Sequence, residues 1–581
     1  MSGRFNAALL RTMLREWKWI FGYIRKYKGT VLLYIFFGVL SSVMSVGVTV
    51  AGKYLIDAVI TKDRTVLLRS AAAAIALLIA NVLLQAVISR VTAVLSTRAD
   101  NELRNEIYAH VVRAEWETIS SFRSGELLNR LEGDVSAVAA GVIGFIPGAF
   151  TKLLTFILSF IVVLRYDSVM AVLALLSAPF FVLSSRFLVK TIRRYHQESR
   201  EMNGKVLSFS EESLRNLQVI KSFDLIKEYI EMFRTVTEKY REVRLKYEKF
   251  NILMTMVLSL LGIAVSYACY GWAVYRLWQG LITVGTMTLF LQISGTLTSS
   301  FSALAALAPR VVSIATSAGR IMEIVQYEAE TDAQAAEAGR LLANAENGVD
   351  LTVENLSFAY KGTDTDVLHE VSFTVHPGER IGIIGRSGNG KTTLLKLILG
   401  LLQPTAGEAR ITVNGESIAV SDSTRRFFSY VPQESAVFTG TVAENLRLGQ
   451  PEATDAALYA ALRLADLAEY IQAQPEGLAF PIEENGENLS RGQLQRLLIA
   501  RAVLREVPVL LFDEATSALD AETEARVLQN LMREDPRKSF ILTTHRQSVL
   551  KHCTKIYAIT ETGRLVPYTG SEETEQKEET E

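Results

Sequence analysis

A glycine-rich segment, Gly385–Thr393, reads GRSGNGKTT and fits the phosphate-binding pattern G-x-x-x-x-G-K-T. Its glycines let backbone N–H groups turn inward around phosphate oxygens, and Lys391 adds a positive charge. The apolar run Ile381–Gly385 predicts a strand that enters the loop, and Thr393–Leu399 predicts a helix that leaves it. Thr392 is expected to bind Mg²⁺ through its hydroxyl. The expected nucleotide-binding residues of this loop are Gly385, Ser387, Gly388, Asn389, Gly390, Lys391, Thr392 and Thr393.

Two adjacent carboxylates follow a second apolar run. Val509–Phe512 has the composition of a buried strand and leads into Asp513 and Glu514. We expect Asp513 to hold Mg²⁺, directly or through water. Glu514 comes next and points in a different direction, so we expect it to be the general base that activates an attacking water. An exposed turn carrying two acids is the alternative.

Leu489–Gln493 reads LSRGQ and lies between these two segments. A phosphate loop alone fits many nucleotide-binding proteins. The three segments, in this order and spacing, resemble the ATP-binding-cassette (ABC) ATPases, with Gly385–Thr393 as the Walker A loop. The resemblance implies ATP and Mg²⁺ as ligands.

The same resemblance gives roles to residues outside the loop. Tyr360 matches the aromatic residue that stacks on adenine, with a core tyrosine as the alternative. Gln433 matches the Q-loop, which senses the γ-phosphate, and it is expected near the Mg²⁺. His545 matches the switch histidine that contacts the γ-phosphate, and Asp520 ends a segment that matches the D-loop.

Ser490, Gly492 and Gln493 match the ABC signature, which in the family meets the γ-phosphate held by a second subunit. The chain has one ATPase copy, so the resemblance implies a dimer of half-transporters. The family usually has glycine where Arg491 stands. This variant fits one half of a heterodimer, and a harmless change in a homodimer fits equally well.

The composition predicts a membrane part in front of this ATPase. Of 581 residues, 49% are hydrophobic. The first 330 residues hold 37 basic and 25 acidic residues, whereas the rest hold 24 and 37. The basic residues flank apolar runs, which favours cytoplasmic loops over nucleic-acid binding. Apolar stretches predict six membrane-spanning helices, at residues 29–52, 70–89, 143–164, 168–185, 250–275 and 277–309.

Two long charged segments separate spans two and three, and spans four and five. Their periodicity predicts helices that extend into the cytoplasm and turn near residues 114–123 and 216–226. These turns resemble the intracellular loops of ABC exporters. Lys53 and Asp57 stand four residues apart and are expected to pair on one helix face. Few other charges lie within the spans, which suits an amphipathic or apolar cargo.

The predicted fold is an α-helical six-span membrane domain with long cytoplasmic helix extensions, followed by an α/β P-loop ABC ATPase domain. The expected parts are an interfacial amphipathic segment (1–28), the membrane domain (29–327), a solvated linker (328–348), the ATPase (349–568) and an acidic tail (569–581).

The chain therefore resembles an exporter-type half-transporter of the cytoplasmic membrane, with its ATPase in the cytoplasm. The resemblance implies ATP-driven export of a drug, lipid or peptide by alternating access, together with a second half-transporter. Uptake of a metal chelate on the same scaffold and an ATP-gated or regulatory membrane protein are the alternatives.

Overall fold

The chain divides into two compact units in the computed structural model. The model describes residues 14–122, 124–172, 195, 198–199, 201–305, 307–327, 329–363, 365–434 and 436–568. Unit 1 comprises residues 1–112 and 122–327, and unit 2 comprises residues 113–121 and 328–581. Most of the expected fourth span, the first 13 residues and the acidic tail lie outside the described residues.

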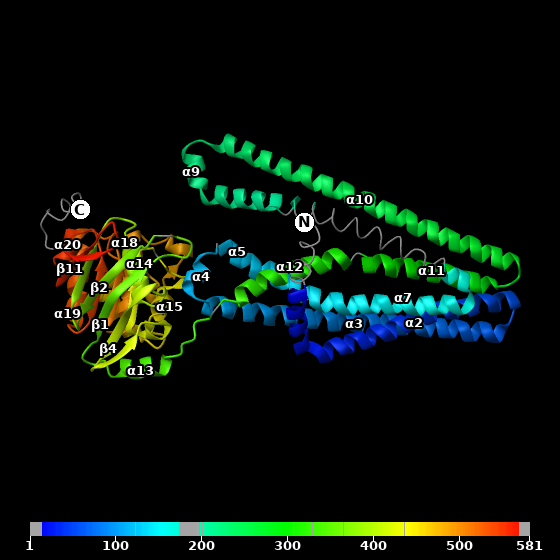
Figure 1. The fold of residues 1–581 in the computed structure, drawn as a ribbon, viewed down its shortest axis with the longest axis horizontal. Coiled ribbons are helices and arrows are strands. Elements are labelled where there is room, and N and C mark those ends of the chain that lie inside the picture. The colour runs from blue at the N-terminus through cyan, green and yellow to red at the C-terminus, as the bar shows by residue number, and fades with distance from the viewer. Residues whose placement is uncertain are drawn as a thin grey trace. The chain divides into compact units, whose positions relative to one another are not determined.

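Unit 1 is helical (Figure 1). Its first helix starts at Leu14 and continues through η1 into α2. Two short π-helical segments, η2 and η3, interrupt the run that leads into α7. The elements are η1 (Arg25–Tyr27), α2 (Lys28–Thr61), α3 (Arg64–Arg113), α5 (Ser124–Asn129), η2 (Arg130–Asp134), α6 (Val135–Ala140), η3 (Gly141–Phe145), α7 (Ile146–Tyr166), α9 (Leu217–Ser222), α10 (Ile226–Trp278), α11 (Val284–Ala305) and α12 (Leu307–Val325).

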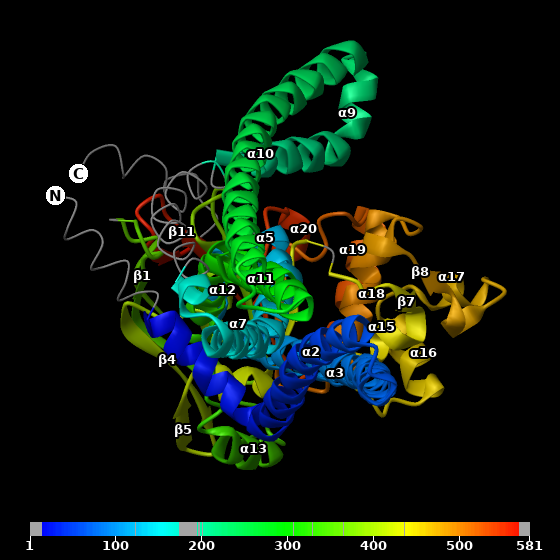
Figure 2. The same ribbon diagram turned by 90° about the vertical axis from the view of Figure 1, so that its right-hand side faces the viewer.

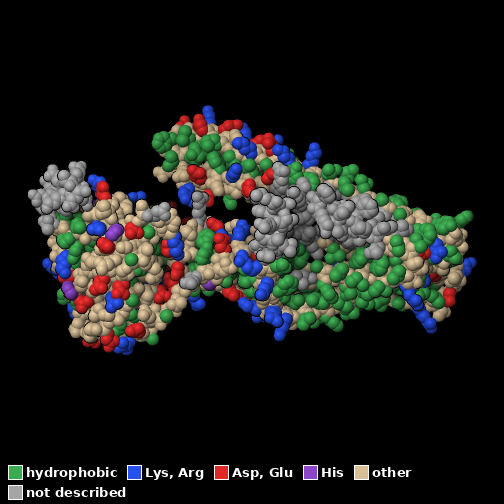
Figure 3. Space-filling model, viewed as in Figure 1, with side chains coloured by type: hydrophobic (Ala, Val, Ile, Leu, Met, Phe, Trp, Pro, Cys, Tyr) green, Lys and Arg blue, Asp and Glu red, His purple; other side chains and the backbone are tan. Residues whose placement is uncertain are grey.

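Within the described residues, three helices are long and apolar enough to cross a membrane: Leu14–Thr61, Arg64–Arg113 and Gly125–Tyr166. Helices α2, α7 and α11 pack against one another, and α10 packs against α11. Hydrophobic side chains cover much of the outward face of unit 1 in Figure 3, with Lys and Arg near the ends of the helices. This surface suits contact with lipid.

The long helices that the sequence predicts are present. Helix α3 has 50 residues and α10 has 53, whereas a bilayer needs about 20. The short helices α4 (Trp116–Ser120) and α9 lie within the two predicted turn regions. In both ribbon views, α9 and the first half of α10 project away from the packed helices of unit 1 (Figures 1 and 2).

The expected pairing of Lys53 with Asp57 is wrong. Lys53 Nζ lies over the rings of Tyr54 and Tyr166, 4.6 and 4.8 Å from their centroids. Asp57 instead accepts hydrogen bonds from the backbone N–H of Gly285 and the hydroxyl of Thr283, each at 2.9 Å. The carboxylate binds here because the first N–H groups of a helix, such as that of Gly285 in α11, have no partner within their own helix.

Unit 2 is built on two large sheets, and β7 and β8 form a third sheet of two short strands. The larger has the order β12-β11-β3-β10-β9-β6, and all neighbours in it are parallel except β12. The smaller, antiparallel sheet has the order β2-β1-β4-β5. The strands are β1 (Asp350–Phe358), β2 (Leu368–Val375), β3 (Arg380–Ile384), β4 (Ala406–Val413), β5 (Glu416–Ala419), β6 (Phe428–Val431), β7 (Gly440–Thr441), β8 (Pro481–Ile482), β9 (Val509–Asp513), β10 (Ser539–Thr543), β11 (Lys555–Ile559) and β12 (Leu565–Pro567).

Helices cover the parallel sheet, so β9 and β10 are buried along their whole length. One core lies between the two sheets and includes α14, while a second packs α15, α16, α18 and α19 against the other face. The helices are α13 (Ala335–Ala343), α14 (Lys391–Ile398), η4 (Asp422–Phe427), α15 (Val442–Arg447), α16 (Asp455–Leu464), α17 (Ala468–Gln472), η5 (Gly477–Ala479), η6 (Glu484–Gly486), α18 (Arg491–Val503), α19 (Ala521–Glu534) and α20 (Gln547–Leu550).

The segment expected to be a solvated linker is packed onto the sheets of unit 2. Helix α13 buries Ala338 and Leu341 in the core between the sheets. Glu330 accepts two hydrogen bonds from the guanidinium of Arg425, both 2.7 Å long. The high alanine content of residues 328–348 suggested a solvated linker, but alanine residues on one face of a helix can pack closely against a core.

Candidate functional site

The phosphate loop joins β3 to α14, as its sequence predicts. Gly388 and Gly390 have φ angles of 93° and 92°, which residues with a Cβ rarely adopt. A Cβ on Gly390 would also lie 3.0 Å from side-chain atoms of Val367 and Leu368. The loop therefore needs glycine at both positions to present its N–H groups at the N-terminus of α14.

Lys391 is nearly buried within this loop. Its Nζ donates to the carbonyl oxygens of Gly385 at 2.7 Å and Arg386 at 3.2 Å, and to His545 Nε2 at 2.8 Å. Burial lowers the pKa of Lys391, and the nearby carboxylate of Glu514 partly opposes that shift. A cation held mainly by neutral oxygen and nitrogen atoms is well suited to exchange them for phosphate.

The parallel register brings the expected acids to the same edge of the sheet. Asp513 at the end of β9 is paired with Thr543 at the end of β10, and β10 is in turn paired with β3. Asp513 is 1% exposed, whereas Glu514 lies just beyond the strand. The carboxyl ends of these three strands therefore form one site, as is usual in open α/β sheets.

Gln433 and His545 both meet Glu514 there. Gln433 Nε2 donates to Glu514 Oε2 at 3.0 Å, and His545 Nε2 lies 3.2 Å from Glu514 Oε1. Nε2 of His545 therefore lies between the Lys391 ammonium group and the Glu514 carboxylate, within reach of both.

The oxygen atoms near the loop fit Mg²⁺. The two oxygens of the buried Asp513 carboxylate accept hydrogen bonds from Tyr430 and Thr543. Thr392 supplies a hydroxyl at the start of α14, and Gln433 supplies an amide oxygen. A hard cation such as Mg²⁺ prefers this all-oxygen donor set and completes it with phosphate and water.

Tyr360 lies beside the loop and is partly exposed. Its hydroxyl is 3.0 Å from the Thr393 hydroxyl, and its ring meets the ring of Phe358 edge-on. The hydrogen bond to Thr393 therefore holds the ring of Tyr360, which is expected to stack on adenine, next to α14.

The signature residues cap a helix. Ser490 and Gln493 form a reciprocal capping box at the start of α18, with bonds of 2.8 and 3.2 Å. A Cβ added at Gly492 would lie only 3.2 Å from the carbonyl oxygen of Ala518. Asp520 caps α19 through the Thr523 N–H, which lowers the pKa of its carboxylate. Within the described residues, no hydrogen bond joins these groups to the phosphate loop.

Sequence reasoning missed several residues of this region. Arg546 donates to the carbonyl oxygens of Leu519 at 2.7 Å and Ser517 at 2.8 Å, so it holds the expected D-loop. Gln495 binds the same loop at Ser517 and Ala518. Arg546 could have been predicted from the sequence, because it directly follows His545. Nothing in the sequence indicates Tyr430 or Thr543, because only the strand register brings them to Asp513.

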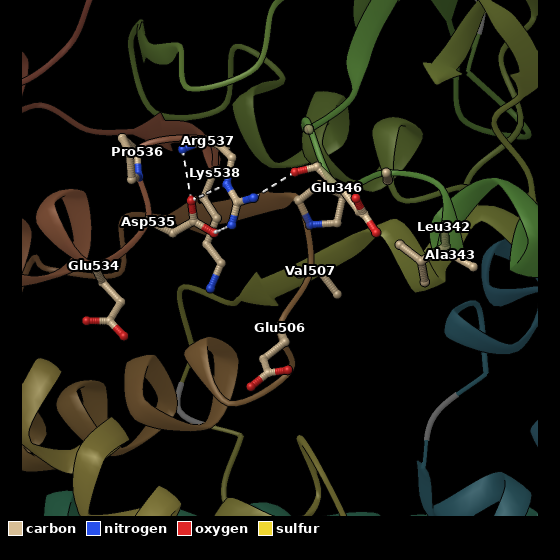
Figure 4. Close-up of a pocket in the computed structure, with 13 residues that line it drawn as sticks. Leu342, Ala343, Glu346, Glu506, Val507, Glu534, Asp535, Pro536, Arg537 and Lys538 are labelled. Atoms are coloured by element: carbon tan, nitrogen blue, oxygen red, sulfur yellow. Dashed lines mark hydrogen bonds and ion pairs between the residues drawn. The ribbon is translucent and has the colours of Figure 1, made fainter. Parts of the chain in front are cut away.

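A cavity of about 670 Å³ lies at the opposite ends of the same strands (Figure 4). Glu506–Pro508 and Pro536–Lys538 line it just before β9 and β10 begin. Arg537 is tied there to Asp535 and to the carbonyl oxygen of Glu346. None of the predicted site residues lines this cavity.

Comparison with known proteins gives matches over both units. Residues 31–301 match the family described as the ABC transporter transmembrane region, and residues 368–517 match the family described as ABC transporter. The ATP-dependent lipid A-core flippase of Bordetella avium (strain 197N) is 30% identical over 455 residues, which cover 77% of this chain and 74% of that protein.

A second relative is the multidrug resistance ABC transporter ATP-binding and permease protein of Lactococcus lactis subsp. cremoris (strain MG1363). It is 27% identical over 491 residues, which cover 84% of this chain and 81% of that protein. A solved structure of a bacterial Atm1-family ABC exporter with ATP bound has a TM-score of 0.79 at 23% identity and covers 94% of both chains. The fold is therefore that of an exporter.

Proposed function

This chain belongs to the ABC transporter family, and we propose that it is one half of a two-chain exporter of the cytoplasmic membrane. It is a membrane protein with an ATPase domain, and it couples ATP hydrolysis to the export of an amphipathic or apolar substrate.

The cluster around Glu514 is the observation that carries the proposed chemistry. The side chains of Lys391, Gln433 and His545 converge on this carboxylate, at distances of 3.8, 3.0 and 3.2 Å. In the proposed reaction Glu514 takes a proton from the attacking water. Lys391 and the N–H groups of the loop hold the β- and γ-phosphates, and His545 contacts the γ-phosphate.

Asp513 and Thr392 are the residues that we propose to hold Mg²⁺, with Gln433 beside them. The ion supplies positive charge to the phosphate oxygens. The buried carboxylate of Asp513 contributes a fixed negative charge, and its hydrogen bonds to two hydroxyls keep it in one orientation. Tyr360 is proposed to stack on adenine, since its ring is partly exposed beside the loop.

The signature residues support assembly with a second chain. Ser490 caps α18 with its hydroxyl and is not bonded to this chain's own phosphate loop within the described residues. We propose that Ser490, Gly492 and Gln493 bind the γ-phosphate held by the partner, and that Asp520 shapes the neighbouring loop. The partner is a second copy of this chain or a different half-transporter.

We propose a substrate with a large apolar surface, such as a lipid or a hydrophobic drug. The relatives named above are a lipid A-core flippase and a multidrug resistance transporter.

Inside-out membrane vesicles that contain the full chain test this proposal. ATP with Mg²⁺ should drive uptake of a fluorescent lipid or a cationic dye into the vesicles, against its gradient. Vesicles with Glu514→Gln serve as the control and should bind ATP without transport. Efflux from the vesicles, or downhill flux that survives Glu514→Gln, would contradict export.

A further inference from the structure

The hydroxyl of Thr543 contacts both acids at the end of β9. Its Oγ lies 2.8 Å from Asp513 Oδ1 and 3.0 Å from the backbone nitrogen of Glu514. A backbone N–H can only donate, so the hydroxyl accepts from Glu514 and gives its own proton to the Asp513 carboxylate. One side chain therefore joins the backbone of one acid to the carboxylate of the other.

The backbone of Glu514 needs such an anchor because of its conformation. Its φ of 49° lies in the left-handed region, which is disfavoured for any residue with a Cβ. A conformation of this kind persists only where neighbouring groups hold it. Here the Glu514 N–H also lies 3.2 Å from the carbonyl oxygen of Thr543, so this one residue supplies both acceptors. The turn aims the side chain at Gln433 and Lys391.

Tyr430, in the neighbouring strand β6, holds the other oxygen of Asp513. Its hydroxyl lies 3.1 Å from Asp513 Oδ2. The phenol O–H is the donor of this pair, because the carboxylate oxygen accepts. Because Thr543 is 2% exposed, water cannot readily replace its hydroxyl.

We propose that Thr543 is a positioning residue that sets the direction of Glu514 and, together with Tyr430, the orientation of the Asp513 carboxylate. This inference rests on the proposed function, in which Glu514 is the general base and Asp513 holds Mg²⁺. Tyr430 contacts only Asp513, so the two hydroxyls separate the effect on the base from the effect on the metal ligand.

Thr543→Val is the first test, because it keeps the branched shape and removes the hydroxyl. In the full-length chain in nanodiscs, kcat for ATP hydrolysis should fall about tenfold or more while KM for ATP stays within about twofold. Thr543→Ser restores the hydroxyl and should recover most of kcat. Thr543→Ala is measured in parallel, so that a misfolded valine variant does not remove the test.

Tyr430→Phe is the matched variant for the metal ligand. Binding of Mn²⁺ in the presence of ATP, followed by electron paramagnetic resonance, should weaken about threefold to tenfold in Tyr430→Phe and in Thr543→Val. At saturating Mg²⁺, kcat should fall less in Tyr430→Phe than in Thr543→Val, because only Thr543 also holds the backbone of Glu514.

Glu514→Gln, measured in the same series, separates the proposed role of Glu514 from the proposed role of Thr543. If it still hydrolyses ATP at the normal rate, the proposed role of Glu514 is wrong. If it is inactive, and if folded Thr543→Val and Thr543→Ala match the wild type in kcat and Mn²⁺ binding, only the role of Thr543 is overturned. Loss of kcat in valine and alanine with recovery in serine supports it.

Discussion

Buried charges have different partners in the two units. In unit 1, Arg130 is 5% exposed and binds Glu126 at 2.6 Å, Glu323 at 2.8 Å and the carbonyl oxygen of Arg320 at 2.9 Å. Asp134, also buried, forms an ion pair with Arg320. Each of these charges is matched by an opposite charge on a neighbouring helical segment.

In unit 2, the buried charges at the site are held mainly by uncharged groups. Lys391 binds carbonyl oxygens and the imidazole of His545, and its nearest carboxylate oxygen, on Glu514, is 3.8 Å away. Asp513 accepts from two hydroxyls. Charges that are matched within the fold stabilise it, whereas charges held by neutral partners remain available to a ligand. Removing a charge should therefore cost stability in unit 1 and chemistry in unit 2.

The largest expected effect is on hydrolysis. Glu514→Gln keeps the shape of the side chain and its contact with Gln433 but cannot take a proton. We expect kcat to fall by about 10²–10⁴-fold, the usual contribution of a general base, while ATP still binds. Phosphate release and nucleotide binding by the purified chain measure the two quantities. Glu452→Gln, on the exposed surface, is the control and should match the wild type.

The comparison predicts a different outcome for Arg130→Met in unit 1. It removes the hydrogen bonds of a buried guanidinium to two half-exposed carboxylates, so the free energy of unfolding should fall by about 1.5–3 kcal/mol. Thermal unfolding in detergent gives the measurement. Arg234→Met removes an exposed pair with Glu231 and should cost less than about 1 kcal/mol. Equal stability of the two variants would break the comparison.

Much of the site could be predicted because its signals are local. The phosphate loop, with a strand before it and a helix after it, lies within one short stretch, and Asp513 follows its own apolar strand. The long helices α3 and α10 likewise follow from continuous periodicity. In each case the residues that define the feature are neighbours in the chain.

The parts that the sequence did not reveal depend on distant segments. Tyr430, Asp513 and Thr543 meet because β6, β9 and β10 are parallel and in one register. The partners of Asp57 come from the start of α11, more than 200 residues away. The four-residue spacing within one helix suggested Lys53 as the partner of Asp57, but Asp57 binds distant groups instead.

Lys391→Ala sharpens the contrast within unit 2. Because Lys391 is held by neutral partners, its loss should leave the fold stable but weaken ATP binding by about tenfold to a hundredfold. The dissociation constant of a fluorescent ATP analogue, measured alongside the unfolding temperature, tests both statements. Lys396→Ala, one turn further along α14, is the control. A large loss of stability with unchanged binding would place Lys391 with the structural charges of unit 1.

Substitution of Arg491 has the smallest expected effect, and its outcome depends on the identity of the partner chain. It is exposed at the first position of α18, where the helix dipole disfavours a cation by about 0.3–1 kcal/mol. Arg491→Gly should therefore change ATP affinity or turnover by about twofold to fivefold, and Arg491→Lys should change neither. The assembly decides how many sites are affected: both in a homodimer, but only the site built from this chain's signature in a heterodimer. Purification of the chain expressed alone makes that distinction, because robust, substrate-stimulated hydrolysis by a two-copy assembly would exclude an obligatory second half-transporter. An inactive product that regains hydrolysis when a different half-transporter is co-expressed would instead place Arg491 at the single altered site of a heterodimer.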